Sequence, residues 1–327
     1  METEPKISLV IPVRDEARSI ERLLRSIAAQ TRLPDEVIFV DAGSNDATRE
    51  LIESRRDAGL PVKVLSIGPA YPGTARNAGV KEASNDVIAF TDGGIELDKD
   101  WLKELSVSMS RGSAVDVVYG NYSPRADTFF KQCLAMATVP PPAPAGGGRM
   151  RSRFIASSLL KKPVWQAVGG FPDYRAAEDR IFMERIEGQG YALRFNPRAT
   201  VLWDIPGNLQ GVFGRFSGYS YHDLIAGRTI GWHIPVLKMY AAALACIGLG
   251  FAASPVFFAL PIAGLALRTV KKIVINRGEP YFRTGYVPLY CIVAGFLIFF
   301  IDMAMFAGWL KYLLNGRHPA RRKPGTA

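Results

Sequence analysis

The first hundred residues alternate apolar runs with segments whose apolar residues recur at helical spacing. Residues 7–12 and 36–41 are nearly unbroken apolar runs, which are typical of parallel strands buried on both faces. Shorter runs at residues 62–65 and 87–92 predict two further strands. The first intervening helix is marked by one set of apolar residues: Ile20, Leu23, Leu24, Ile27 and Ala28. This alternation predicts a parallel α/β sheet.

Residues 115–230 show a weaker pattern. Strands are predicted over residues 115–119, 192–195 and 200–203, and a helix over residues 177–188. Residues 138–149 run from a series of prolines into three glycines, so no regular element is expected there. This segment is either a solvated linker or a mobile loop over a binding site.

The last third of the chain is far more apolar. Residues 239–267 carry no charge, and residues 284–310 contain only Asp302. A membrane-spanning helix needs about 20 apolar residues, so both stretches are candidate spans. Pro255 and Pro261 would break or kink a helix. The first stretch is therefore either a hairpin of two short helices or one tilted helix.

Charge divides the chain at the same place. The protein has 327 residues and a net charge of +10, but residues 234–327 hold eleven Lys and Arg against two acidic residues. The nearly neutral body is a poor match for nucleic acid, whereas a basic tail beside apolar runs suits anionic lipid headgroups. We therefore expect a catalytic domain over residues 1–230. Residues 231–327 are expected to form a membrane-anchoring region with two or three transmembrane helices and a basic C-terminal tail.

Two aspartates stand at the carboxyl ends of predicted strands. Asp41 ends the second strand and Asp92 ends the fourth. Ligands of parallel α/β sheets bind beyond these ends, so both carboxylates are expected to face one crevice.

Around these aspartates the chain resembles the family-2 glycosyltransferases, which have the GT-A fold. The resemblance covers about residues 6–205. It implies a Rossmann-like, mostly parallel sheet and the transfer of a sugar from a nucleotide-diphosphate sugar. The matching motifs, in chain order, are Ile7-Ser-Leu-Val-Ile-Pro-Val-Arg-Asp-Glu16, Glu36-Val-Ile-Phe-Val-Asp-Ala-Gly-Ser-Asn-Asp-Ala-Thr48, Gly73-Thr-Ala-Arg-Asn-Ala-Gly79, Ala89-Phe-Thr-Asp-Gly-Gly94, Gly169-Gly-Phe-Pro172 and Ala177-Glu-Asp-Arg180.

The resemblance also implies a donor site. In the family, the aspartate at Asp41 accepts hydrogen bonds from the base, and the arginine at Arg76 reaches the nucleotide. The family often has a second aspartate after the first, where this chain has Ala42. The nucleotide-sugar-binding residues expected on this basis are Pro12, Arg14, Glu16, Asp41, Arg76, Asn77, Asp92 and Glu178.

Asp92 falls where the family has an Asp-x-Asp motif, whose carboxylates hold a divalent metal that bridges the donor's phosphates. Mg²⁺ or Mn²⁺ is the expected cofactor, since both prefer oxygen ligands. Here the second aspartate is Gly94. If the strand continues through it, Asp92 and Glu96 point to the same side, and Glu96 is the expected second metal ligand. The alternative is a site with one carboxylate that binds metal weakly or not at all.

Glu178 and Asp179 begin a predicted helix. In the family, the aspartate of this pair is the general base that takes the proton of the acceptor hydroxyl during inversion. The resemblance therefore implies Asp179 as the catalytic residue, and a helix N-terminus favours its ionised form. A helix-capping acid without a catalytic role is the other interpretation.

Absent motifs narrow the function further. The processive members of the family carry Gln-x-x-Arg-Trp, whereas this chain has Gln210-Gly-Val-Phe-Gly-Arg-Phe216, which disfavours a polymer-extruding synthase. Neither a P-loop nor a Gly-x-Gly-x-x-Gly after the first strand is present, which argues against a P-loop enzyme or a dinucleotide dehydrogenase.

The expected partners are a nucleotide-sugar donor, a lipid or lipid-linked acceptor and the membrane, with no nucleic acid. The expected location is the cell (inner) membrane, as a multi-pass protein with a cytoplasmic catalytic domain. The alternative is a catalytically decayed nucleotide-binding or scaffold protein of a membrane glycan-assembly complex.

Overall fold

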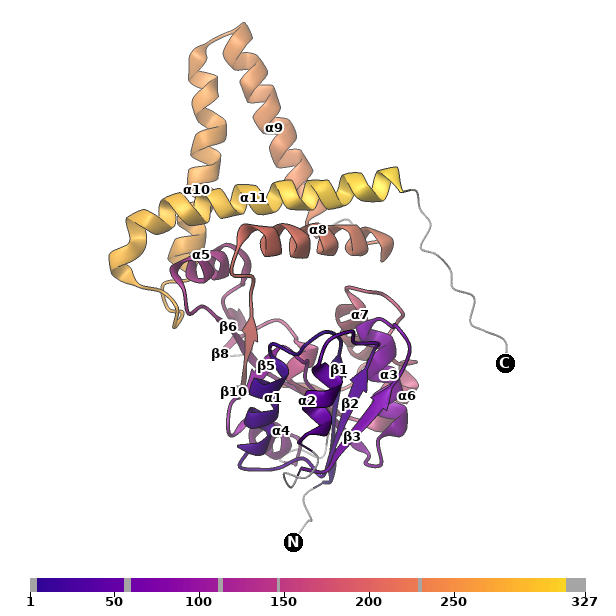
Figure 1. The fold of residues 1–327 in the computed structure, drawn as a ribbon. Coiled ribbons are helices and arrows are strands. Elements are labelled where there is room, and N and C mark those ends of the chain that lie inside the picture. Colours follow the sequence, from indigo (N-terminus) through magenta and orange to yellow (C-terminus); the bar gives the residue numbers. More distant parts are fainter. Residues whose placement is uncertain (1–4, 56–59, 111–113, 146–147, 229–230, 316–327) are drawn as a thin grey trace. The chain divides into compact units, whose positions relative to one another are not determined.

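A computed structural model describes residues 5–55, 60–110, 114–145, 148–228 and 231–315 (Figure 1). The chain forms two compact units. We call them the sheet unit, Met1–Arg125 with Pro142–Asp204, and the helical unit, Ala126–Pro141 with Ile205–Ala327. The expected division into a catalytic domain, residues 1–230, and a membrane-anchoring region, residues 231–327, stays a prediction.

An eight-stranded mixed sheet is the centre of the sheet unit, in the order β3-β2-β1-β4-β9-β6-β10-β5. Parallel pairs join β3, β2, β1 and β4, and also join β6 to β10, whereas β9 and β5 run antiparallel to their neighbours. The strands are β1 (Ile7–Val13), β2 (Glu36–Asp41), β3 (Val62–Ser66), β4 (Val87–Phe90), β5 (Ile95–Leu97), β6 (Val117–Arg125), β9 (Ser158–Lys161) and β10 (Leu193–Asp204).

Helices cover the sheet because each buries one apolar stripe. In α1 the buried residues include Ile20, Leu23, Leu24 and Ile27, as the sequence spacing predicts. The strands β1 and β2 are buried along almost their whole length, which explains their continuous apolar runs. The helical elements of this unit are α1 (Ile20–Ala28), α2 (Thr48–Glu53), α3 (Pro72–Glu82), α4 (Trp101–Ser110), η1 (Ile155–Ser157), α6 (Lys162–Ala167) and α7 (Glu178–Gly188).

Three expected elements differ from the structure. The fourth strand ends at Phe90 rather than residue 92, because Gly93 and Gly94 form a turn. The two short strands expected within residues 192–203 are one strand, β10, with an irregularity between Asn196 and Thr200. The Pro-Gly segment contains a short antiparallel pair, β7 (Ala143–Ala145) and β8 (Gly148–Met150).

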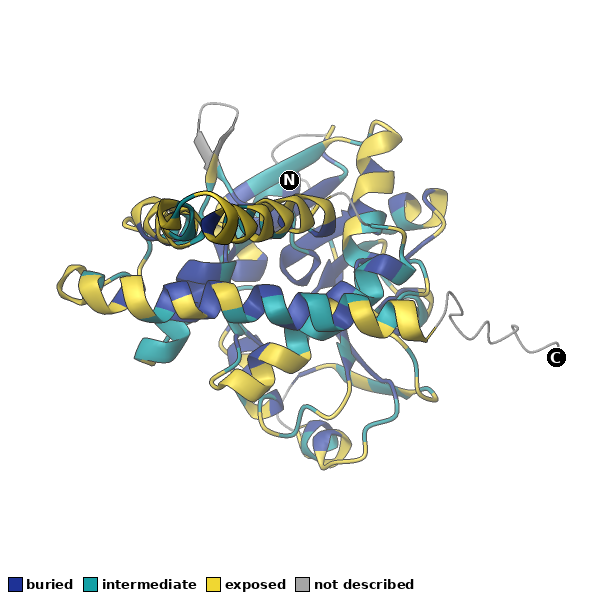
Figure 2. Ribbon diagram, turned by 90° about the horizontal axis from the view of Figure 1, so that it is seen from above, coloured by how far each residue is buried: buried dark blue, intermediate teal, exposed yellow. Residues whose placement is uncertain are grey.

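The helical unit contains a hairpin, which is one of the two forms expected for residues 239–267. The helices α9 (His233–Ala252) and α10 (Ala259–Ile275) are joined through η2 (Pro255–Phe258). Figure 2 shows that the hairpin is largely exposed, whereas α11 alternates buried and exposed positions. The other elements are α5 (Phe129–Thr138), α8 (Leu209–Ile225), η3 (Thr284–Tyr286) and α11 (Val287–Leu314).

Two described helices are long and apolar enough to cross a membrane, His233–Ala252 and Thr284–Leu314. They differ in burial. Of the most apolar 18-residue stretch, about a tenth is buried within the protein in the first helix and half is buried in the second. The expected number of transmembrane helices, two or three, therefore stays a prediction.

Glu36 ties together the amino ends of three strands. Its carboxylate accepts hydrogen bonds from Ser8 Oγ at 2.6 Å and from Ser84 N at 2.9 Å, and Lys63 Nζ lies 2.6 Å away. Burial opposes ionisation, but these donors lower the pKa of Glu36 to about 2 from 4.5. The ionised carboxylate therefore stabilises the fold.

We predict that Glu36→Gln lowers the free energy of unfolding at neutral pH by about 1–3 kcal/mol, because buried donors lose their partner. The pKa of Glu36 is lower in the folded protein than in the unfolded chain. Its stabilisation is thus present above pH 4.5 and is lost as the pH falls towards 2. The measurement is urea denaturation at pH 7 and at pH 3, followed by tryptophan fluorescence. The difference in unfolding free energy between the wild type and Glu36→Gln should be smaller at pH 3 than at pH 7. The exposed Glu53→Gln is the control, and equal midpoints for both variants at pH 7 would contradict the prediction.

Candidate active site

The carboxyl ends of β1 and β2 carry two loops that hold each other in place. Asp15, at a left-handed φ of 55°, accepts a hydrogen bond from Asn45 N at 2.7 Å, and Asp15 N donates to Ser44 Oγ at 3.0 Å. Asp41 is buried, and its Oδ1 accepts a hydrogen bond from Ser44 N at 2.9 Å. Asp41 therefore shapes the turn that follows β2, while Arg14 is exposed beside it in the β1 loop.

Arg76 is buried and joins two acidic segments of the site. Its Nη2 lies 2.6 Å from Asp92 Oδ1, and its Nη1 lies 2.9 Å from Glu178 Oε1. Burial alone would lower the pKa of Arg76, but the surrounding carboxylates of Asp92, Glu178 and Asp179 raise it above its usual value. The guanidinium is therefore held as a permanent cation between the loop after β4 and the start of α7.

Gly73 lies at the start of α3, the helix that carries Arg76, and allows α3 to approach the start of α7 closely. A Cβ at Gly73 would lie 2.7 Å from Pro172 O and 3.1 Å from Glu178 Cγ. Gly79, at the other end of the motif, faces Val10 in the core instead. The two glycines let α3 pack closely against α7 and the sheet.

Asn77 binds protein groups rather than pointing into open space. Its Nδ2 donates to Phe171 O at 2.8 Å, and its Oδ1 accepts from Phe171 N and from Trp165 Nε1, both at 2.9 Å. Gly170 has a φ of +68°, and a Cβ there would lie 2.7 Å from Asn77 Oδ1. In the structure, Asn77 thus positions the Gly169–Pro172 turn that leads towards α7.

The two acids at the start of α7 have different environments. Glu178 is buried against Arg76, and its burial raises its pKa, with Asp179 adding to the effect and Arg76 opposing it. Asp179 is partly exposed, and its Oδ1 accepts a hydrogen bond from Arg180 N at 2.8 Å. Of the two carboxylates, Asp179 is the one that a substrate can reach.

Glu16 lies against the glycine pair that replaces the second aspartate of the Asp-x-Asp motif. A Cβ at Gly93 would lie 2.8 Å from Glu16 Cγ, and one at Gly94 would lie 3.8 Å from Glu16 Oε2. Burial raises the pKa of Glu16; the hydrogen bond from Ser19 opposes this, and the charge of Asp92 adds to it. The small residues therefore make room for the Glu16 carboxylate next to Asp92.

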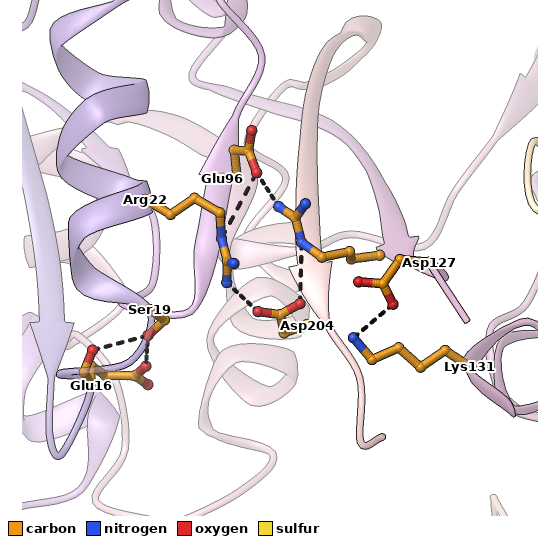
Figure 3. Close-up of polar contacts among 8 residues, drawn as sticks. Glu16, Ser19, Arg22, Glu96, Asp127, Lys131 and Asp204 are labelled. Atoms are coloured by element: carbon orange, nitrogen blue, oxygen red, sulfur yellow. Dashed lines mark hydrogen bonds and ion pairs between the residues drawn. The ribbon is translucent and has the colours of Figure 1, made fainter. Parts of the chain in front are cut away.

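Glu96 belongs to a separate group of four charged side chains (Figure 3). Arg125 donates a hydrogen bond to Glu96, and Arg22 Nε lies 3.8 Å from the same carboxylate. Both arginines also pair with Asp204. Glu96 is thus already neutralised by two guanidinium groups.

The geometry that would have placed Glu96 beside Asp92 does not occur. The chain turns at Gly93 and Gly94, and β5 is the edge strand, separated from β4 by β9, β6 and β10 in the sheet. Side chains therefore do not alternate along one strand from Asp92 to Glu96.

Three members of the charged group were not expected from the sequence. Arg125 and Asp204 end the parallel strands β6 and β10 in register with each other. The rule that selected Asp41 and Asp92, polar residues at carboxyl ends of strands, would also have selected Asp204, which follows the strand expected over residues 200–203. It would not have selected Arg125, because the strand expected over residues 115–119 continues to residue 125 in the structure. Arg22 lies on α1 and carries no comparable signal.

The site thus combines the loops that follow β1 and β2 with an acidic cluster around Arg76 at the start of α7. The sequence model described as "Glycosyl transferase family 2" matches residues 8–156, which include Asp41, Arg76 and Asp92. Over these residues the chain is similar to glycosyl transferase family 2. Part of the expected site, including Asp179, lies beyond the matched residues.

Two relatives match more than half of the chain. Glycosyltransferase AglE of Haloferax volcanii is 29% identical over 211 residues, which are 59% of this chain and 65% of that relative. Succinoglycan biosynthesis protein ExoM of Rhizobium meliloti is 25% identical over 272 residues, or 78% of this chain and 85% of that one. The chain thus spans just under two thirds of AglE and most of ExoM.

A solved structure has a fold similar to that of this chain. The mannosyltransferase PcManGT of Pyrobaculum calidifontis, in complex with GDP-Man and Mn²⁺, matches with a TM-score of 0.64 and 19% identity over 96% of this chain and 88% of that one. At this identity the match concerns the fold alone. The predicted class is confirmed: an α/β GT-A domain followed by C-terminal helices.

We predict that Arg76→Met destabilises the sheet unit by about 3–5 kcal/mol, because it leaves the buried Glu178 carboxylate without its partner. Adding Glu178→Gln should recover part of that loss, since the double variant no longer leaves the buried carboxylate of Glu178 unpaired, and only the more exposed Asp92 still lacks Arg76. Urea denaturation of the single and double variants measures both effects. Arg49→Met, which breaks an exposed pair with Glu53, should leave the midpoint unchanged. An Arg76→Met midpoint equal to that of Arg49→Met would contradict the structural role.

Proposed function

We propose that the protein transfers a sugar from a nucleotide-diphosphate sugar to a membrane-lipid or lipid-linked acceptor, with inversion at the sugar carbon. The observation that carries the proposal is the joint placement of Asp92, Glu178 and Asp179 around one buried arginine. This arrangement brings the carboxylate expected near the donor phosphates and the carboxylate expected to activate the acceptor into one site.

The donor is proposed to lie over the carboxyl ends of β1 and β2. Asp41 has a second carboxylate oxygen that can accept from the N–H edge of a base. Pro12, in β1, and the exposed Arg14 and partly exposed Glu16 that follow it line the same edge. GDP-Man in PcManGT supports a nucleotide-sugar donor for this chain. In this proposal Arg76 and Asn77 act on the donor indirectly. Arg76 positions Asp92, and Asn77 positions the Gly169–Pro172 turn.

Asp179 is the proposed general base. Its partial exposure and its place at the N-terminus of α7 keep a carboxylate available to an acceptor hydroxyl. Glu178, bound to Arg76, is the positioning residue beside it. In an inverting transfer the base removes the proton of the acceptor hydroxyl while the nucleoside diphosphate leaves from the opposite face.

Mg²⁺ or Mn²⁺ is the proposed cofactor, and Asp92 is its proposed protein ligand. Among the described residues, no three His, Cys, Asp or Glu side chains converge on one metal position. This fits a cation held by one or two carboxylates together with donor phosphates, as is usual for Mg²⁺. Glu16, beside Gly94, is better placed as the second carboxylate than Glu96, which two arginines already bind. The metal would neutralise charge on the departing diphosphate.

Membrane attachment at the cytoplasmic face of the cell (inner) membrane is the proposed location. The apolar lengths of α9 and α11 and the basic charge of residues 234–327 support it. The likeness to ExoM, a succinoglycan biosynthesis protein, is consistent with an acceptor used in glycan assembly.

Asp179→Asn should lower turnover by about 10²–10⁴-fold, because the amide cannot take the acceptor proton. Donor binding should survive. The assay measures release of nucleoside diphosphate from a panel of GDP- and UDP-sugars, with a membrane-lipid extract as acceptor, and calorimetry measures nucleotide affinity. Asp173→Asn, an exposed carboxylate in the preceding loop, is the matched control.

Unchanged turnover in Asp179→Asn would refute the assignment of the base. If the wild-type protein binds none of the nucleotide diphosphates, the decayed scaffold is favoured over the enzyme. The observations that favour this second candidate are Ala42 and Gly94, which stand where the resembling family often has aspartates.

Chelation should weaken nucleoside-diphosphate binding if Asp92 holds a metal. We expect the affinity of the wild-type protein for GDP or UDP, measured by calorimetry, to be higher with Mn²⁺ than with EDTA. Asp92→Asn should remove this difference, and Glu16→Gln should reduce metal affinity by about 10–100-fold. Glu96→Gln should keep the metal dependence. Equal wild-type affinity with Mn²⁺ and with EDTA would refute metal-assisted binding.

A further inference from the structure

The α9–α10 hairpin exposes apolar side chains along both legs and at its tip. Large residues there are exposed by 66–83%: Leu244, Phe251, Val256, Ile262 and Leu267. No charged residue lies between Lys238 on α9 and Arg268 on α10. Water is a poor solvent for such a surface, and a contiguous exposed apolar surface marks an interaction site.

The length of the hairpin limits what it can cross. The charge-free part of α9, residues 239–252, is about 21 Å long, and the return leg from residue 255 to residue 267 is at most about 20 Å as a helix. The hydrocarbon core of a bilayer is about 30 Å thick. Both legs can reach past the midplane of the bilayer, at a depth of about 15 Å, but do not reach the opposite surface. The return leg limits the depth of insertion more strictly, because the charged residues Arg268, Lys271 and Lys272 follow it directly.

Polar contacts with α11 hold the open end of the hairpin, which we call its foot. Arg268 on α10 binds both carboxylate oxygens of Asp302 on α11, and Tyr240 Oη on α9 donates to Asp302 Oδ2 at 3.1 Å. Asp302 is completely buried. The charges of Arg268 and Asp302 therefore offset each other where the apolar part of the hairpin begins.

The helix α11 lies across this foot rather than along the hairpin (Figure 1). One face of it packs on α8: Ser220 Oγ donates to Met305 O at 2.7 Å, and a Cβ at Gly308 would lie 2.2 Å from Ser217 O. The exposed apolar residues recur every three or four positions on another face of α11: Leu289, Ile292, Phe296 and Phe299. The helix α11 thus presents a second exposed apolar face, while its other face is covered by protein.

We propose that the hairpin enters a phospholipid bilayer from one side without crossing it and returns to the same surface, with α11 lying flat at that surface. The partner of the exposed apolar surface is therefore lipid. Lys238 on α9 and Lys271 on α10 bracket the inserted part and suit anionic headgroups. The inference rests on the proposed membrane attachment but not on sugar transfer.

Cysteine labelling distinguishes insertion from crossing. In a full-length parent with Cys246→Ala and Cys291→Ala, Ser254→Cys places a thiol at the hairpin turn. Gly278→Cys is the matched control near the foot, where a side chain meets no neighbour. A membrane-impermeant maleimide is applied to sealed right-side-out and inverted membrane vesicles.

The proposal expects Gly278→Cys to be labelled from one face only, and Ser254→Cys to be labelled from neither face until detergent is added. Labelling of Ser254→Cys from the face opposite Gly278→Cys would show that the hairpin crosses the bilayer and would overturn the proposal. Labelling of both variants from the same face would show that the hairpin lies outside the lipid, which would also overturn it.

Flotation with vesicles of phosphatidylethanolamine and phosphatidylglycerol tests the partner. The full chain should float with the vesicles, and Phe251→Glu with Leu260→Glu should lower partitioning by on the order of 100-fold, because both charges would enter hydrocarbon. Leu33→Glu, at an exposed leucine of the sheet unit, should float like the wild type. Unchanged flotation of the double variant would refute insertion of the hairpin. A wild-type protein that self-associates and ignores vesicles would refute membrane attachment itself and identify a second copy as the partner.

Discussion

The buried guanidinium of Arg76 holds together segments that lie far apart in the chain. Asp92 is 16 residues away and Glu178 is 102 residues away, yet both carboxylates bind the same side chain. Removing an arginine from water is costly, and the cost is offset only when strong hydrogen bonds to opposite charges replace the water. The position of α7, and with it the exposure of Asp179, therefore depends on an ion pair in the core of the site.

This arrangement also sets the charge of the active site. One arginine faces Asp92, Glu178 and Asp179, and Glu16 lies close by, so carboxylates outnumber the cation. A nucleoside diphosphate bound as proposed would bring further negative charge to the same place. Coulomb repulsion at such short range is severe in a partly buried site, which makes a divalent cation the natural counter-charge for the donor. The proposal of a metal thus follows from the charge balance as well as from the family.

The sequence predicted the local elements well because their signals are local. Apolar runs located β1 and β2, and helical spacing located α1, since each depends on neighbours within one element. It could not predict the buried state of Arg76, the bonds of Asn77 to the Gly169–Pro172 turn, or the arginines that bind Glu96. Those contacts join distant residues, and no periodicity records them. Glu96 illustrates the limit, because its expected role depended on a strand that two glycines interrupt.

The apolar tail shows a related limit. A run of apolar residues has the same hydropathy whether the helix crosses a bilayer, lies flat on it or packs against other helices. For α11 the structure supplies the missing information, because α8 and α5 already cover part of its surface and Asp302 on α11 faces Arg268. For α9 the proposed limit comes from the partner leg α10, because its basic residues begin before a helix of that length could reach the far side of a bilayer. In this proposal the depth of insertion is a property of the pair of helices and cannot be assigned to either one alone.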